Sequence, residues 1–192
     1  MELKNINVIG CHATSKSYAD SILRSGFRSG AGRKGTGVYF WHADKFKCPI
    51  AELLCDGWYE QQFIRKKFSK CPDQSEAIIW CDISYNEDNY LNFDTPEIRN
   101  GLSQLIDSYS EEIESYENEG KHYRALRLIS DLHNVFIESL SEDEGRDISV
   151  IRASVPYPAG FIEKDPRIRY KSNPFSYIVK KMEHIQIRKD SI

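Results

Sequence analysis

Residues 11–41, CHATSKSYADSILRSGFRSGAGRKGTGVYFW, decide the fold. Their hydrophobic spacing predicts an apolar strand that ends at His12, a short helix, a glycine-rich loop and a second strand over 38–41. His12 and Tyr39 are therefore expected near the facing ends of two strands. Two polar side chains brought together in this way form a candidate functional site.

The boundaries of the helix and the loop are marked by local signals. Thr14 or Ser15 can cap the helix N-terminus, and Gly26 can end the helix. The segment 28–37 holds four glycines and no aliphatic side chain larger than alanine. Because it cannot bury an apolar face, we expect it to run as a loop.

Composition places broad limits on the class of protein. A chain of 192 residues with 40% apolar and 12% aromatic residues suits one folded domain, expected over 1–192. The 26 basic and 29 acidic residues give a net charge of −3, which provides no general attraction to nucleic acid. No apolar run approaches the roughly 20 residues of a membrane span, and no secretory pattern opens the sequence. We therefore expect a cytoplasmic protein without a membrane segment.

The cysteines argue against a disulfide or metal framework. There are five, at positions 11, 48, 55, 71 and 81, and none forms a C-x-x-C pair. We expect buried free thiols and no metal. Cys11 beside His12 is a possible nucleophile and base, but neighbours on a strand point to opposite faces, which disfavours that pairing.

The remainder of the chain alternates between strand and helix patterns. Strands are expected at 76–85, 90–94, 148–155, 176–179 and 184–187, and helices at 49–68 and, as two helices separated near 119–120, within 95–145. The sequence thus predicts an α+β fold with mostly antiparallel strands and a helical insert over 95–145. The basic run 65–70 either complements a helix dipole or contacts phosphate.

Three segments together resemble a known family. His12-Ala13-Thr14, Ser25-Gly26-Phe27 and GTGVYF at 35–40 resemble the NAD-binding core of the ADP-ribosyltransferases of the diphtheria-toxin and poly(ADP-ribose) polymerase type. The block NPFSYIVKKMEHIQI at 173–187 is similar to the closing pattern of that family. The resemblance implies a split pair of mostly antiparallel sheets around an NAD cleft. It also implies that the insert recognises targets or partners.

The resemblance assigns roles to residues of the first two segments. His12 would bond a ribose hydroxyl of the adenosine half of NAD, and the backbone of Ala13 would pair with the nicotinamide carboxamide. Thr14 would bond the nicotinamide side through its hydroxyl. Tyr39 would stack on the nicotinamide ring.

The glycine-rich segment would lie over the dinucleotide. Gly37 belongs to its matched part, and Arg33 and Lys34 would meet the NAD diphosphate. The alternative is that both basic residues only keep the loop soluble.

One position departs from the family pattern. Where the family has a glutamate before YIV, this chain has Ser176, which offers a hydrogen bond but no charge. Glu163 and Glu183 are the neighbouring carboxylates that could substitute. Without the glutamate, transfer of a single ADP-ribose unit is expected rather than chain elongation.

The resemblance therefore implies a mono-ADP-ribosyltransferase, with NAD as co-substrate and a protein side chain or nucleic acid as acceptor. An intracellular toxin or defence effector, with an inhibitory or antitoxin partner, fits this activity. The alternative is a catalytically inactive module that binds NAD or ADP-ribose. Hydrolysis of NAD with water as acceptor is a third interpretation.

Overall fold

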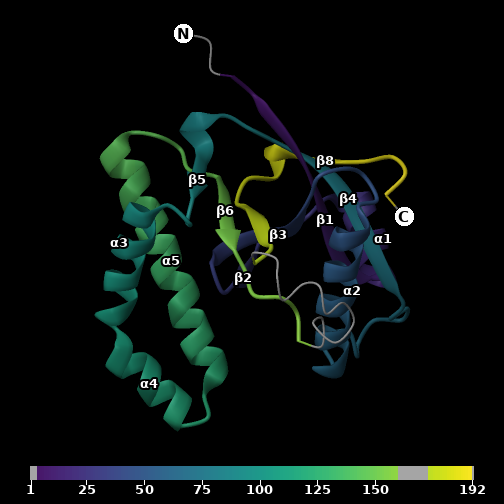
Figure 1. The fold of residues 1–192 in the computed structure, drawn as a ribbon. Helices are drawn as coiled ribbons and strands as arrows, with labels where there is room; N and C mark the ends of the chain where they lie inside the picture. The colour runs from purple at the N-terminus through teal and green to yellow at the C-terminus, as the bar shows by residue number, and fades with distance from the viewer. Residues whose placement is uncertain (1–3, 160–172, 192) are drawn as a thin grey trace.

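A computed structural model describes residues 4–159 and 173–191 of the chain (Figure 1). The strands are β1 (Ile6–Ser15), β2 (Gly30–Gly32), β3 (Gly35–Ala43), β4 (Glu76–Tyr85), β5 (Tyr90–Asn92), β6 (Val150–Ser154), β7 (Phe175–Val179) and β8 (Ile185–Ile187). The helices are α1 (Lys16–Ser25), α2 (Pro49–Ile64), α3 (Pro96–Asp107), α4 (Ser110–Asn118) and α5 (His122–Glu144). The expected mixture of strands and helices, with a helical insert between β5 and β6, is confirmed.

The strands form one hydrogen-bonded path in the order β5-β6-β7-β3-β1-β4-β8, with β2 paired to β3. Every pair is antiparallel except β5 with β6. This path differs from the two separate sheets that the resemblance implies. The strands form one sheet because β3 joins its two halves. Trp41 of β3 pairs with Cys11 of β1 on one side and with Ser176 of β7 on the other.

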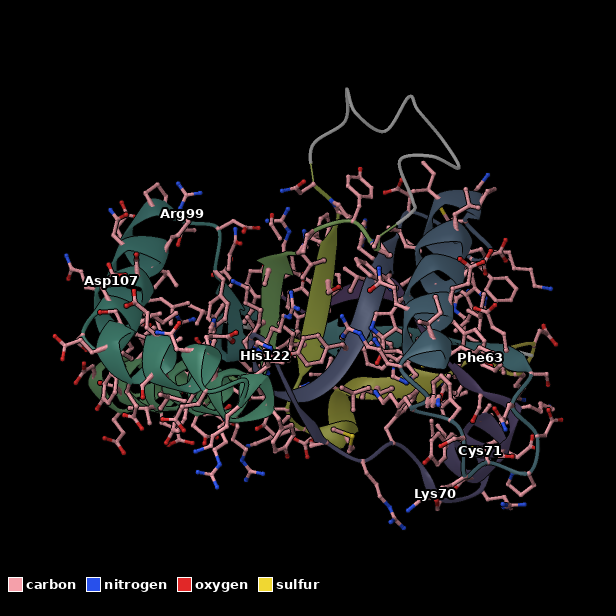
Figure 2. The ribbon with its side chains drawn as sticks, turned by 90° about the horizontal axis from the view of Figure 1, so that it is seen from below. Phe63, Lys70, Cys71, Arg99, Asp107 and His122 are labelled. Atoms are coloured by element: carbon pink, nitrogen blue, oxygen red, sulfur yellow. The ribbon has the colours of Figure 1, made fainter. Side chains whose placement is uncertain are left out.

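The helices cover the two faces of the sheet unequally. One face packs against α1 and Phe27 around a core that includes Phe40 and Ile79. On the other face, α2 covers β1 and β4, whereas α3 and α5 cover β5, β6 and β7. Figure 2 shows the insert and α2 well apart, with strands of the sheet in view between them. β3 therefore runs between the two helical covers.

Several element boundaries differ from the sequence prediction. The strand expected to end at His12 continues to Ser15, because β1 pairs with β4 along its whole length, and the strand expected over 38–41 spans Gly35–Ala43. The glycine-rich segment is a hairpin, in which Gly30–Gly32 pairs with residues 35–37, because backbone pairing needs no apolar side chains. Helix α2 ends at Ile64 rather than near residue 68, and Lys66 adopts a φ of +58° that a helix cannot continue. The insert holds three helices because the chain breaks before Ser110 as well as at Gly120.

Both ends of helix α1 are capped by residues that the sequence predicts. The Oγ of Ser15 accepts a hydrogen bond from the Tyr18 N–H at 3.4 Å, so Ser15 and not Thr14 is the cap. Gly26 ends the helix with a φ of +78°. The five cysteines are buried free thiols, and Cys11 points its sulfur toward Cys55 of α2, at 3.3 Å.

Among the helices of residues 4–159 and 173–191, none combines the length and apolar character of a membrane span. In the same residues, no three metal-ligating side chains come together.

Candidate functional site

The sheet opens between β1 and β3 directly after Cys11. The two strands pair only from Ile9 to Cys11, opposite Ala43 to Trp41. Beyond that point β1 continues to pair with β4 up to Ser15, whereas β3 pairs with β7. The edge of β1 that follows Cys11 is therefore no longer lined by β3.

The backbone of Ala13 faces this opening. Just beyond the β1–β4 ladder, the Lys16 N–H donates to the carbonyl of Ser75 at 2.7 Å. Because hydrogen-bonded pairs alternate along an antiparallel ladder, Thr14 and His12 direct their backbone groups at β4, and Ala13 directs its N–H and C=O at the opposite edge. The φ of Ala13 is not positive, so alanine fits where the family has glycine.

The His12 side chain bridges the opening to β3. Its Nδ1 lies 2.9 Å from the carbonyl oxygen of Tyr39, which the Ala13 N–H would meet if the ladder continued. A carbonyl oxygen only accepts, so Nδ1 carries the proton and Nε2 of the neutral ring presents a lone pair. Within residues 4–159 and 173–191, no group is hydrogen-bonded to Nε2. His12 is therefore set up as a hydrogen-bond acceptor.

Aromatic rings surround the imidazole on both faces of the sheet. Phe27 meets it edge-on at 5.3 Å and Phe40 lies at 5.9 Å, both from the α1 face, while Trp58 of α2 lies at 6.3 Å. Burial among these rings lowers the pKa of His12; the bond to the Tyr39 carbonyl opposes this shift, and the charge of Lys67 adds to it. The neutral ring is therefore favoured at pH 7.

The Tyr39 side chain supports the hairpin. Its hydroxyl donates to the Gly35 carbonyl at 2.7 Å and accepts from the Lys34 N–H at 2.9 Å. A Cβ on Gly32 would lie 2.5 Å from the ring, so the close approach requires glycine there. Burial raises the pKa of Tyr39, which keeps the hydroxyl a donor. The structure thus joins His12 to the backbone of Tyr39 and the Tyr39 ring to the hairpin.

The hairpin places the other residues of the glycine-rich segment. Gly37 sits where β3 meets β7, and its missing side chain makes room for Ile178. Arg33 is exposed at the tip. Lys34 lies toward the insert, where burial lowers its pKa and Asp94 opposes that shift. The structure therefore does not bring Lys34 to His12.

Helix α5 fixes the hairpin through one amide side chain. Asn134 accepts from the Thr36 N–H and donates to the Thr36 hydroxyl, both at 2.9 Å. We expect Asn134→Ala to lower the free energy of unfolding by about 1–2 kcal/mol, because the partly buried N–H of Thr36 loses its acceptor. The tip carries Arg33 and Lys34, so trypsin should cut the variant there faster than the wild type. Asn100→Ala, on the exposed surface of α3, is the control. Equal rates of cleavage of all three proteins would mean that Asn134 does not hold the hairpin in place.

Ser176 is buried on β7, between Trp41 of β3 and Ala153 of β6. Alternation along the paired strands puts it on the same face as Trp41 and Tyr39, between α2 and the insert. Thr14 is also buried, but on the α1 face, so the structure does not bring its side chain to Tyr39.

Of the two neighbouring glutamates, the structure describes Glu183. Glu163 lies outside the described residues. Glu183 is exposed in a single 3-10 turn, next to a strand in which Ile185 pairs with Ile83, and Ile83 pairs with Val8. Val8 precedes His12 by four residues, about 13 Å along a strand. The structure therefore does not place Glu183 where it could substitute for the missing glutamate.

Two open hollows lie elsewhere on the surface. One, of about 370 Å³, lies between the C-terminal half of α2 and residues 74–76. The other, of about 450 Å³, lies beside Phe46 and residues 186–190. His12, Tyr39 and Ser176 line neither of them. The candidate site is thus defined by the Ala13 backbone edge and the His12 Nε2 at the sheet opening, for which the described residues provide no partner.

The sequence does not single out two residues of the site, Trp58 and Lys67. Trp58 lies within the predicted helix 49–68, and Lys67 belongs to the basic run 65–70, for which phosphate contact was one of two interpretations. Only the reversal of the chain at Lys66 brings Lys67 back over Trp58. The left-handed lysine gives no signal in the sequence.

A second buried histidine makes the stability depend on pH. His133 of α5 donates from Nδ1 to the Ile129 carbonyl, and its buried Nε2 has no partner among the described residues. Burial lowers its pKa, and the charge of Lys34 adds to the shift. Below about pH 6.5 the unfolded chain binds protons that the folded state does not, so stability falls by up to about 1.4 kcal/mol per pH unit for each such histidine.

We expect His133→Leu to remove this contribution. Between pH 7.5 and 5.5, the urea midpoint should fall less in the variant than in the wild type, while His12 still contributes to the remaining loss. His122→Leu, at an exposed position of the same helix, is the control. If the wild type and His133→Leu lose stability equally, His133 is not the acid-sensitive group.

Comparison with known proteins gives no relative. No family model matches the chain, and searches of curated proteins and of solved structures likewise find no match.

Proposed function

We propose that the protein is a mono-ADP-ribosyltransferase that uses NAD as co-substrate. The observation that carries the proposal is the opening between β1 and β3, where Ala13 presents one N–H and one C=O on the same strand edge. A primary carboxamide such as that of nicotinamide needs one donor and one acceptor, side by side. His12 adds a neutral acceptor, Nε2, suited to a ribose hydroxyl.

The chemistry asks little of acid–base groups. The bond between nicotinamide and ribose C1′ breaks with its electron pair going to nicotinamide, which leaves as a neutral base. The acceptor bonds to C1′ and releases its proton to water. The protein must orient the ribose and hold the nicotinamide. Ala13 and His12 supply that orientation, and the Tyr39 ring supplies the stacking face.

Ser176 supports transfer of one unit. It shares a face of the sheet with Tyr39 and provides a hydroxyl where a carboxylate would activate a further acceptor. The acceptor in this proposal is a protein side chain or a nucleic acid, in the cytoplasm, and the insert is the surface for an inhibitory or antitoxin partner. The same absence of a carboxylate, together with the remote Glu183, favours the second candidate, an inactive module that binds NAD or ADP-ribose.

The test uses NAD labelled in its adenylate half, incubated with the purified protein and a cell lysate. Products are separated into protein, RNA, DNA and free ADP-ribose, with Tyr39→Ala in parallel and its unfolding midpoint checked. Label in one macromolecular fraction that disappears in the variant is the expected result. Free ADP-ribose alone would indicate hydrolysis. If NAD binds to the protein but is not cleaved, the result would favour the second candidate, the inactive NAD-binding module.

A further inference from the structure

A lysine lies beside His12 at the opening of the sheet. The ammonium of Lys67 is 5.0 Å from the centroid of the Trp58 ring, and the Trp58 ring is 6.3 Å from that of His12. The charge of Lys67 is close enough to lower the pKa of His12. These three residues form what we call the Lys67 cluster.

The position of Lys67 over Trp58 requires a strained backbone at the preceding residue. Lys66 adopts a φ of +58°, a left-handed conformation that costs a non-glycine residue free energy. The turn is anchored by the next apolar residue, Phe68, which is 1% exposed and stacks on Tyr59 of α2 at 5.2 Å. The chain therefore leaves α2, reverses, and returns with Lys67 over Trp58. Backbone strain that persists in this way is common at ligand sites.

Among the described residues, no carboxylate balances the charge of Lys67. Within residues 4–159 and 173–191, no acidic side chain forms an ion pair with it, whereas Lys16 pairs with Asp20 on α1. Burial beside the indole lowers the pKa of Lys67, yet the residue keeps exposed surface. Its ammonium has donors for which a phosphate oxygen is the natural acceptor.

We propose that Lys67 binds the diphosphate of the dinucleotide, the role that the resemblance gave to Arg33 and Lys34. The inference rests on the proposed NAD site, because His12 is the group that the two share. The diphosphate joins the two riboses, so a cation beside His12 meets it when the adenosine ribose is bound there. Lys34 precedes Gly35, which lies against Asn134 and His133 of the insert, and the charge of Lys34 lowers the pKa of His133.

The experiment measures binding and not turnover. NAD and ADP-ribose are titrated by calorimetry into the full chain as wild type, Lys67→Met and Lys70→Met. Methionine keeps an unbranched stem over Trp58 and removes the charge. Lys70 is an exposed cation of the same segment, labelled in Figure 2, and is the matched control. We expect Lys67→Met to weaken both ligands about tenfold or more, and Lys70→Met to stay within about twofold.

The other outcomes separate the two proposals. If the wild type binds both ligands and Lys67→Met binds them equally well, the NAD site stands and Lys67 is not its phosphate ligand. Equal losses in both variants would reveal a general surface-charge effect and overturn the inference. If the wild type binds neither ligand, both proposals fail.

A second readout needs no ligand. The imidazole of His12 can be titrated by NMR in the wild type and in Lys67→Met. Removal of the neighbouring charge should raise the pKa of His12. An unchanged pKa would mean that Lys67 does not lie beside His12 in solution, which would overturn the inference as well.

Discussion

Gly37→Ala is expected to lower the free energy of unfolding by about 2–3 kcal/mol. A Cβ at this position would lie 2.6 Å from Cγ2 of Ile178 and 3.0 Å from the carbonyl oxygen of Val179. Both atoms belong to β7, which is paired with β3 at that point and buried, so the neighbours cannot move aside easily. Overpacking of this kind costs about 1–3 kcal/mol in folded cores. Urea unfolding followed by circular dichroism measures the loss.

Gly30→Ala provides the matched control. Gly30 is the register partner of Gly37 in the hairpin, and a Cβ there would meet nothing within 4 Å. The change should alter stability by less than about 0.5 kcal/mol. Similar losses in the two variants would mean that the contact between Gly37 and β7 is not the cause.

The second large effect is expected at His12, where His12→Ala should reduce ADP-ribosyl transfer at least about a hundredfold. The change removes the Nε2 acceptor and the Nδ1 donor to the Tyr39 carbonyl. It also leaves a gap between Phe27 and Phe40, which should cost about 2 kcal/mol of stability. Transfer of labelled ADP-ribose and the unfolding midpoint must therefore be measured together.

His12→Gln separates the loss of chemistry from the loss of packing. Its amide can still donate to the Tyr39 carbonyl, but it does not reproduce the imidazole acceptor on the other side. We expect a nearly unchanged midpoint with transfer lost, while His122→Ala on exposed α5 surface should retain activity. Wild-type transfer by a stably folded His12→Gln would refute the assignment of His12 to the site.

The sequence predicted those parts of the fold that depend on neighbouring residues. The cap at Ser15, the stop at Gly26 and the strand that became β4 all follow from local side-chain chemistry and short apolar runs. The glycine-rich segment was predicted wrongly as a loop, because a strand made of glycines carries no apolar alternation. The backbone of residues 30–37 pairs nevertheless.

The arrangement of the site could be predicted only in part. His12 was expected near β3, and its imidazole does contact the Tyr39 carbonyl. The direction of Lys34 depends on the insert, whose Asn134 binds Thr36 across 98 residues of sequence. The position of Lys67 depends on the left-handed backbone conformation of Lys66, which no sequence pattern predicts. Contacts over such separations are set by packing and not by local propensity.

The parallel pairing of β5 with β6 has a consequence for how the chain can change. Tyr90 lies beside Val150, so the insert leaves and re-enters the sheet on neighbouring strands that run the same way. Parallel neighbours cannot be joined by a tight hairpin and need a crossover of about a dozen residues. A deletion that joins β5 directly to β6 should therefore disrupt the sheet. Helix α4 has no buried residue, so the insert can vary in length there, whereas α3 and α5 are held by the core that they form with β5, β6 and β7.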